Sequence, residues 1–163
     1  MTDVTKVHEQ IETLKVDVFI PGHAPRVTTA LFSKSRKHLI EREGGRCHVC
    51  NCTAEETGHP LEAHHFPIER SLAEMIDWAE GSRIRKDFPF FGWGSFEETN
   101  PYAFVDDMNV NGLLLCKQHH TGLDEGIHAL PHPIWVAQKY GKEGYKFSNV
   151  EIIHHDYEHD KDL

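Results

Sequence analysis

Hydrophobic and polar positions follow the period of an α-helix in two long segments of the chain. The first covers 28–43, where apolar residues from Leu31 to Ile40 recur on one face, and Gly44-Gly45 ends the pattern as a helix C-cap would. The second covers 68–79 and stops at Gly81. Both segments are therefore predicted to be helices that bury one face.

Shorter apolar runs predict strands and further helices. We expect strands at 61–66, where Pro67 would stop the pairing, and at 111–116, which contains three consecutive leucines. A short helix is expected at 117–125, and a second from Pro133 to Gly141, since proline is well tolerated in a first helical turn. A last strand is expected at 145–153.

Two segments show no regular pattern. Residues 1–26 are predicted to form an irregular arm, and residues 82–106, rich in glycine, proline and aromatic residues, a long inserted loop. A length of 163 residues suits one ordinary domain. The pattern predicts a single α+β domain over 27–153, followed by an acidic, histidine-rich tail over 154–163.

Charge and apolar content limit the partners. The formal net charge of −9 argues against a protein that holds nucleic acid by broad phosphate neutralisation. The segment from Arg26 to Arg46, however, contains six basic residues and only two acidic ones. This local excess of positive charge allows a local nucleic-acid footprint. No apolar run approaches the roughly 18 residues of a membrane span, and no secretory signal is visible. We therefore expect a cytoplasmic protein without a membrane partner.

The cysteines and histidines predict a metal site. Cys47 and Cys50 are separated by two residues, as are Cys116 and His119, and each pair can converge on one tetrahedral ion from a single turn. Four such ligands leave no position for water, so we expect a structural zinc ion. Cys52 is interpreted as a spare thiol, with the alternative that it replaces His119 as fourth ligand.

The order of these motifs resembles a known family. The chain contains Cys47-x₂-Cys50, then Glu62-Ala-His64-His65, then Asn111-x₄-Cys116-x₂-His119-His120. This order is similar to that of the HNH endonucleases, whose ββα-metal fold combines two strands and a helix with a zinc knuckle. The resemblance covers 47–128 and implies an HNH-like core with flanking helices.

The resemblance also implies roles for individual residues. His64 and His120 would bind one catalytic divalent ion, and His65 would be the general base. Asn111 would orient His65 through a hydrogen bond to the backbone of the connecting loop. Because successive side chains of a strand alternate, neighbouring His64 and His65 are expected to face different ways.

The third ligand of the catalytic ion has two candidates. The family's usual spacing leads to Asp124, whereas His128 lies one turn further on the same face. We favour His128, because imidazole suits a transition-metal or mixed site while carboxylate suits Mg²⁺. The expected catalytic ion is Mg²⁺, Mn²⁺, Ni²⁺ or Zn²⁺.

These features predict an endonuclease that hydrolyses DNA phosphodiester bonds, of the kind found in phages, mobile elements or restriction systems. An imidazole with a pKa near ~6.5 can take a proton from water at neutral pH, and a divalent ion can offset the charge of the transition state. The alternative is a catalytically inactive, zinc-stabilised module that binds nucleic acid or protein. A further alternative is a metal buffer to which His154-His155 contributes.

Overall fold

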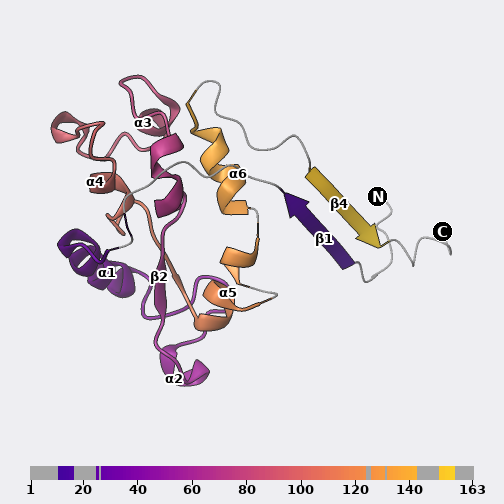
Figure 1. Cartoon of the computed structure of the whole chain (residues 1–163). Coiled ribbons are helices and arrows are strands. Elements are labelled where there is room, and N and C mark those ends of the chain that lie inside the picture. The colour runs from indigo at the N-terminus through magenta and orange to yellow at the C-terminus, as the bar shows by residue number, and fades with distance from the viewer. Residues whose placement is uncertain are drawn as a thin grey trace, which may run out of the picture. The chain divides into compact units, whose positions relative to one another are not determined.

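The computed structural model describes residues 11–16, 25, 27–123, 126–130, 132–142 and 151–156. The chain forms two compact units, which we describe separately (Figure 1). The smaller unit combines Met1–Phe19 with Phe147–Leu163, and the larger unit is Ile20–Lys146. The sequence predicted one domain over 27–153, and that boundary stays a prediction.

The smaller unit contains an antiparallel pair of strands. β1 (Ile11–Val16) pairs with β4 (Glu151–Asp156), so that Ile11 lies opposite Asp156. The sequence predicted an irregular arm over 1–26 and a strand over 145–153. The strand at 11–16 corrects the first prediction within that range. β4 confirms a strand at 151–153 and continues to Asp156, while residues 145–150 of the second prediction lie outside the described residues. A strand whose partner is distant in sequence leaves only a weak local signal, because pairing rather than local preference defines it.

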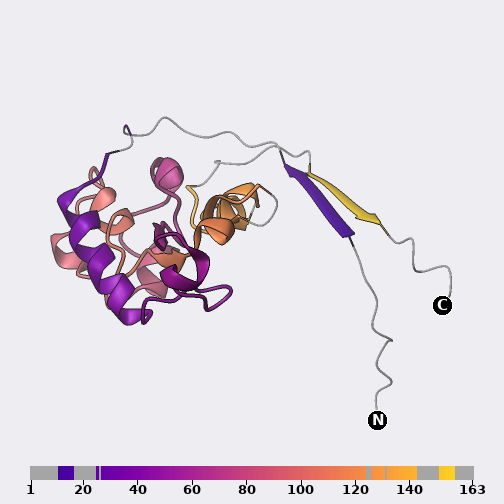
Figure 2. The same ribbon diagram turned by 90° about the horizontal axis from the view of Figure 1, so that it is seen from below.

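The larger unit is built around a second antiparallel pair. β2 (Glu62–His64) pairs with β3 (Leu113–Leu115), and Ala63 lies opposite Leu114. α1 (Ala30–Arg42) lies on one side of this pair and α5 (Lys117–Thr121) on the other (Figures 1 and 2). The two strands and α5 therefore lie together, and the overall class is mixed α+β as expected.

Short helical elements make up much of the remaining described chain. They are α2 (Ala54–Thr57), η1 (Arg70–Met75), α3 (Arg83–Asp87), η2 (Trp93–Ser95), α4 (Tyr102–Val105), η3 (Ile127–Ala129) and α6 (His132–Lys139), the η elements being 3₁₀ turns. The helix predicted over 68–79 is thus reduced to η1. Among the described residues, no helix has the length and apolar character needed to cross a membrane.

The segment 82–106 is not the long loop that its composition predicted. It contains three short helical elements and packs an aromatic cluster around Phe104, which is fully buried. The rings of Trp78, Phe88, Phe91 and Trp93 lie 5.1 to 5.6 Å from the ring of Phe104. Burial of these large rings gives the segment a core of its own, which explains its order despite its glycines and prolines.

The main core joins α1 to the strands. Its buried members are Leu39, Leu61, Met108, Leu114 and Leu115, together with the thiols of Cys47 and Cys116. Ser35 on the same face of α1 is also buried, and its Oγ accepts a hydrogen bond from the Met108 backbone N–H at 2.9 Å. Ser35 and Leu39 of the predicted inner face are therefore buried, and Ser35 is satisfied by hydrogen bonds, whereas Leu31, which the pattern placed on the same face, is 37% exposed.

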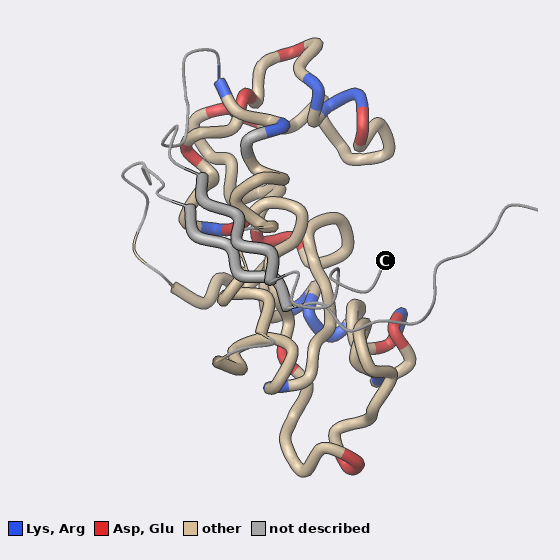
Figure 3. The backbone as a smooth tube through the Cα atoms, turned by 90° about the vertical axis from the view of Figure 1, so that its right-hand side faces the viewer, with Lys and Arg blue, Asp and Glu red and all other residues tan. Residues whose placement is uncertain are grey.

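Several basic residues in and near α1 donate hydrogen bonds to other parts of the protein. Arg36, Arg42 and Arg46 donate hydrogen bonds to the backbone oxygens of Leu61, Asn109 and Asn51, at 2.9 to 3.1 Å. Lys and Arg are interspersed with Asp and Glu along the larger unit (Figure 3). These contacts show that at least three cations of the predicted basic segment bridge parts of the protein itself.

Candidate metal centre and histidine pocket

Three cysteines and one histidine come together at the end of the β2–β3 pair. The ligand atoms of Cys47, Cys50, Cys116 and His119 all lie within 4.8 Å of one another. The Sγ atoms of Cys50 and Cys116 are 3.9 Å apart, and His119 Nδ1 lies 3.1 Å from Cys116 Sγ. In a tetrahedral site with Zn–S bonds near 2.3 Å, sulfur atoms are about 3.8 Å apart. The group can therefore hold a metal ion, and its spacing is compatible with a structural zinc.

Local backbone geometry positions these four ligands. Cys47 N donates to Cys52 O at 2.9 Å, and Asn51, with a φ of 61°, closes the tight turn that carries Cys47 and Cys50. A hydrogen bond of 2.8 Å from His48 N to Leu114 O attaches this turn to β3. Cys116 is the N-cap of α5, so that His119 lies one helical turn after it on the same side.

The surroundings of Cys47 favour the thiolate form. Burial raises the pKa of this thiol, but hydrogen bonds from the backbone N–H groups of Cys50, Cys116 and Val49 outweigh that effect and lower the pKa to about 6. Thiolate is the form that binds zinc. Cys52 is not part of the group, and a hydrogen bond with Cys50 raises its pKa. The geometry therefore favours His119 over Cys52 as the fourth member.

Three further histidines form a second group. His64 from β2, His120 from α5 and His128 from η3 present ring nitrogens that lie within 4.8 Å of one another. His64 and His120 are buried. The alternative third ligand, Asp124, lies outside the described residues, so only the preferred choice of His128 is seen in position.

Two carboxylates contact this second group. Glu62 Oε2 is 2.6 Å from His120 Nδ1, and Glu69 Oε1 is 3.3 Å from His64 Nε2 and 3.6 Å from His128 Nδ1. His120 Nε2 and His128 Nε2 are 3.0 Å apart. The contact of Glu62 with Nδ1 orients the His120 ring so that its Nε2 faces the other histidines.

His64 has the properties of a metal ligand. Its side chain is only 1% exposed, and its Nε2 atom has no hydrogen-bond partner in the described part of the chain. Burial first, and then the nearby His128, His120 and His65, lower the pKa of His64 to about 3. The ring is therefore neutral near pH 7, with an unshared electron pair on a buried nitrogen. A bound cation would satisfy that nitrogen, so these residues fit an ion.

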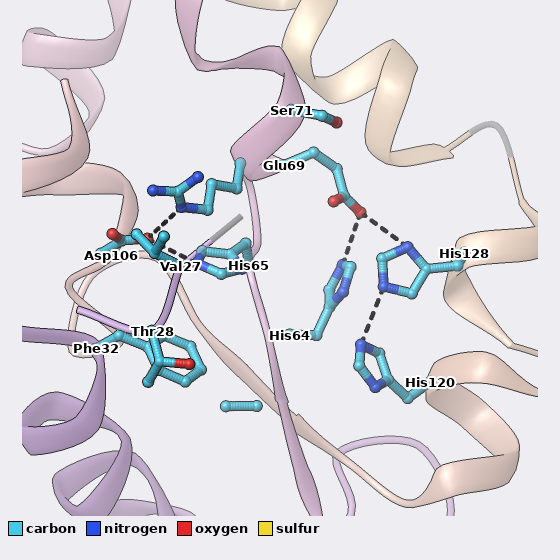
Figure 4. Close-up of a pocket in the computed structure, with 12 residues that line it drawn as sticks. Val27, Thr28, Phe32, His64, His65, Glu69, Ser71, Asp106, His120 and His128 are labelled. Carbon is cyan, nitrogen blue, oxygen red and sulfur yellow. Dashed lines mark hydrogen bonds and ion pairs between the residues drawn. The ribbon is translucent and has the colours of Figure 1, made fainter. Parts of the chain in front are cut away.

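His65 faces the opposite side of β2 from His64, as the alternation along a strand predicts (Figure 4). His65 Nε2 lies 3.0 Å from Asp106 Oδ1, and the imidazole stacks on the ring of Phe32 with centroids 5.4 Å apart. No described residue bonds the Nδ1 atom of His65, which leaves this nitrogen available to the cavity. The stacking on Phe32 and the contact of Nε2 with Asp106 hold the ring in one orientation.

Asp106 is a buried carboxylate with three partners. It is 2% exposed and contacts His65, the Arg70 guanidinium at 3.3 Å and the Thr29 hydroxyl at 3.2 Å. Burial alone would raise its pKa, but the hydrogen bond from His65, the charge of Arg70 and the bond from Thr29 together lower the pKa below 3.8. Asp106 is therefore ionised at neutral pH and favours a proton on His65 Nε2.

Asn111 joins the segment that follows His65 to the segment that precedes Asp106. It is fully buried, and its Oδ1 accepts from Ile68 N at 2.8 Å while its Nδ2 donates to Ile68 O at 2.9 Å and Val105 O at 2.8 Å. The predicted bond to the loop after His65 is thus present. Because Val105 precedes Asp106, the same amide also positions the carboxylate that contacts His65.

His65 and the three-histidine group line one cavity of about 510 Å³ (Figure 4). Its wall includes His64, His65, His120 and His128. Glu69, Arg70 and Asp106 also line it. A ligand in this cavity is therefore surrounded by both His65 and the three-histidine group.

Sequence reasoning missed the carboxylates of this site. Asp106 was assigned to the end of the inserted loop, and neither Glu62 nor Glu69 was given a role. Glu62 had a usable signal, because it precedes His64 by two residues on one strand and so shares its face. No comparable local signal connects Asp106 to His65, which it reaches across 41 residues of chain.

No known protein family, curated protein or solved structure matches this chain. The candidate site therefore has to be interpreted from its own residues and geometry.

Proposed function

We propose that this protein is a metal-dependent endonuclease of the HNH type that hydrolyses DNA phosphodiester bonds. The observation that carries the proposal is the cavity in which an oriented His65–Asp106 pair faces the same space as the group of His64, His120 and His128. A base and a cation site in one cavity are the two elements that hydrolysis of a phosphodiester requires.

The order of elements supports the assignment to the HNH type. β2 ends at His64 and is followed directly by His65, β3 leads into Cys116, and α5 carries His119 and His120. This strand, strand and helix order, with a Cys₃His group at its end, is what the resemblance to the ββα-metal fold implies. The combination supports a nuclease scaffold more strongly than the Cys₃His group or the three-histidine group does alone.

His65 is the general base of the proposed reaction. Asp106 holds the Nε2–H tautomer of His65, so the unshared electron pair lies on Nδ1 of a side chain that lines the cavity. Nδ1 takes a proton from the attacking water, and the ionised Asp106 stabilises the imidazolium that results. The stacking on Phe32 keeps the ring in position during this transfer.

His64, His120 and His128 would hold the divalent ion. Bound there, an ion such as Mg²⁺, Mn²⁺, Ni²⁺ or Zn²⁺ supplies positive charge against the negative charge that develops on the phosphate. Glu62 supports this role by accepting a hydrogen bond from His120 Nδ1, which directs Nε2 of that ring inward.

The competing function is a zinc-stabilised binding module without catalysis. The net charge of −9 and the internal hydrogen bonds of Arg36, Arg42 and Arg46 favour it, because both reduce the positive surface available to DNA. This alternative needs the Cys₃His group but gives no role to the His65–Asp106 pair.

Plasmid cleavage distinguishes the two functions. Protein purified with its zinc would be incubated with supercoiled plasmid and Mg²⁺, Mn²⁺ or Ni²⁺, and with EDTA as the metal-free comparison. We expect metal-dependent nicking that His65→Ala abolishes. His59→Ala, which removes an exposed histidine outside the cavity, should retain full activity.

Zinc content and thermal unfolding of each variant would be measured alongside. Equal nicking by wild type and His65→Ala, or no nicking with any ion in zinc-loaded protein, would reject the nuclease and favour the binding module.

A further inference from the structure

Among the residues that the structure describes, Glu69 is the one carboxylate that contacts two histidines of the second group at once. Its Oε1 atom lies 3.3 Å from His64 Nε2 and 3.6 Å from His128 Nδ1. The side chain is 15% exposed and points into the cavity (Figure 4). A half-buried carboxylate beside a buried imidazole is costly unless a hydrogen bond or a cation joins them.

The contact between Glu69 and His64 is not a hydrogen bond that would join the two side chains. The Nε2 atom of His64 has no hydrogen-bond partner although it lies 3.3 Å from Glu69 Oε1. Two ligand atoms bound about 2.0–2.2 Å from one tetrahedral ion lie about 3.3–3.6 Å apart. The distances from Glu69 Oε1 to His64 Nε2 and to His128 Nδ1 both fall in this range, as they would for a carboxylate that shares one ion with each imidazole.

The hydrogen bonds of the remaining histidine agree with this arrangement. His128 Nε2 is 3.0 Å from His120 Nε2, and His120 Nδ1 is 2.6 Å from Glu62 Oε2. If His120 donates its Nδ1–H to Glu62, its Nε2 accepts the Nε2–H of His128, which leaves the unshared pair of His128 on Nδ1. That nitrogen is the one that faces Glu69.

We infer that Glu69 is a direct ligand of the divalent ion, beside His64 and His128. Glu69 then takes the ligand position that the proposed function gives to His120. His120 instead holds the tautomer of His128, and Glu62 orients His120. This inference rests on the metal centre of the proposed function and changes its character, because the carboxylate comes from the residue before η1 and not from Asp124. Two imidazoles and one carboxylate select transition ions such as Mn²⁺, Co²⁺ or Zn²⁺ over Mg²⁺.

The test is Co²⁺ binding to zinc-loaded protein, followed through the visible absorption of the cobalt ion and through calorimetry. We expect wild type to bind one Co²⁺ beyond its zinc, and Glu69→Gln to bind it at least about 10-fold more weakly with a changed absorption spectrum. Glu69→Asp keeps the charge and should bind more tightly than Glu69→Gln. Glu80→Gln makes the same chemical change at an exposed position and should match wild type.

The outcomes separate this inference from the nuclease. Binding of Co²⁺ by Glu69→Gln with wild-type affinity and spectrum would overturn the role of Glu69, even if the protein cleaves DNA. Loss of the Co²⁺ site in Glu69→Gln, with zinc content and unfolding temperature unchanged, would establish the ligand, even if no variant cleaves DNA. A wild type that binds no second ion would reject the inference as well.

Discussion

Replacement of Asp106 by asparagine tests how the base of the proposed nuclease is oriented. The change removes the charge that favours a proton on His65 Nε2, while the side chain keeps nearly the same volume. A hydrogen bond to a charged group contributes about 1.5–3 kcal/mol, and if this contribution is made in the transition state its loss lowers the rate about 10- to 150-fold. We therefore expect plasmid nicking by Asp106→Asn to fall by one to two orders of magnitude.

The same substitution has a structural cost that must be measured separately. The Arg70 side chain is 11% exposed, and its contact with Asp106 loses the charge of the carboxylate. Weakening of this buried pair is expected to cost about 1–3 kcal/mol of unfolding free energy, a decrease of roughly 2–10 °C in unfolding temperature. Activity would therefore be compared well below the unfolding temperature of both proteins.

The pH dependence of stability has a defined sign. The pKa of Asp106 is lower in the folded protein than its unfolded value near 3.9, so its ionisation stabilises the fold above about pH 4, and this contribution is lost as the pH falls through the folded pKa. The difference in stability between wild type and Asp106→Asn should therefore be constant above about pH 5 and shrink below about pH 4. Chemical denaturation at several pH values measures it.

Asp107→Asn is the matched control, because Asp107 is the next residue and does not line the cavity. A rate for Asp106→Asn equal to that of Asp107→Asn and wild type, measured on folded protein, would refute the role of the carboxylate in orienting His65.

Three further perturbations test other parts of the structure. Asn111→Ala removes three hydrogen bonds and leaves buried backbone groups of Ile68 and Val105 without partners. It should therefore lower the unfolding free energy, measured by chemical denaturation, by about 3–5 kcal/mol. A loss below about 1 kcal/mol would contradict the assigned role of these hydrogen bonds. Cys116→Ser should remove the bound zinc, measured by elemental analysis, and abolish cooperative thermal unfolding, whereas Cys52→Ser should retain one zinc per chain. Phe104→Ala should lower the unfolding free energy by about 3–5 kcal/mol, because it removes the central ring of the aromatic cluster. Zinc content should stay at the wild-type level, since this cluster is separate from the cysteine group. Loss of zinc in this variant would show that the two are coupled.

Much of the local structure follows from short-range sequence patterns. α1 lies within the predicted 28–43, because its apolar spacing and the glycines after it act within a few residues. The same holds for the two ligand pairs, since residues separated by two positions in a turn or helix lie side by side whatever surrounds them. Opposite orientations of His64 and His65 likewise follow from the backbone of a strand.

Tertiary structure decided which distant groups meet. Segment 82–106 lacks a local pattern, and it becomes ordered only because Phe104 gathers aromatic rings from 78 to 93. β1 is likewise defined by its pairing with β4 at the other end of the chain. In each case the stabilising contact joins residues far apart in sequence, so local preference alone carries little information about it.

The candidate site shows most clearly which features follow from local sequence and which depend on tertiary contacts. The residue types and spacing of the cysteines and histidines were sufficient to propose two metal-binding groups. Their partners were not accessible from sequence, because Asp106 and Glu69 reach His65 and His128 only after the strands and helices have packed. The sequence by itself therefore determined which side chains could carry the chemistry, and the tertiary structure decided which carboxylates orient them, because those contacts depend on packing between separate segments of the chain.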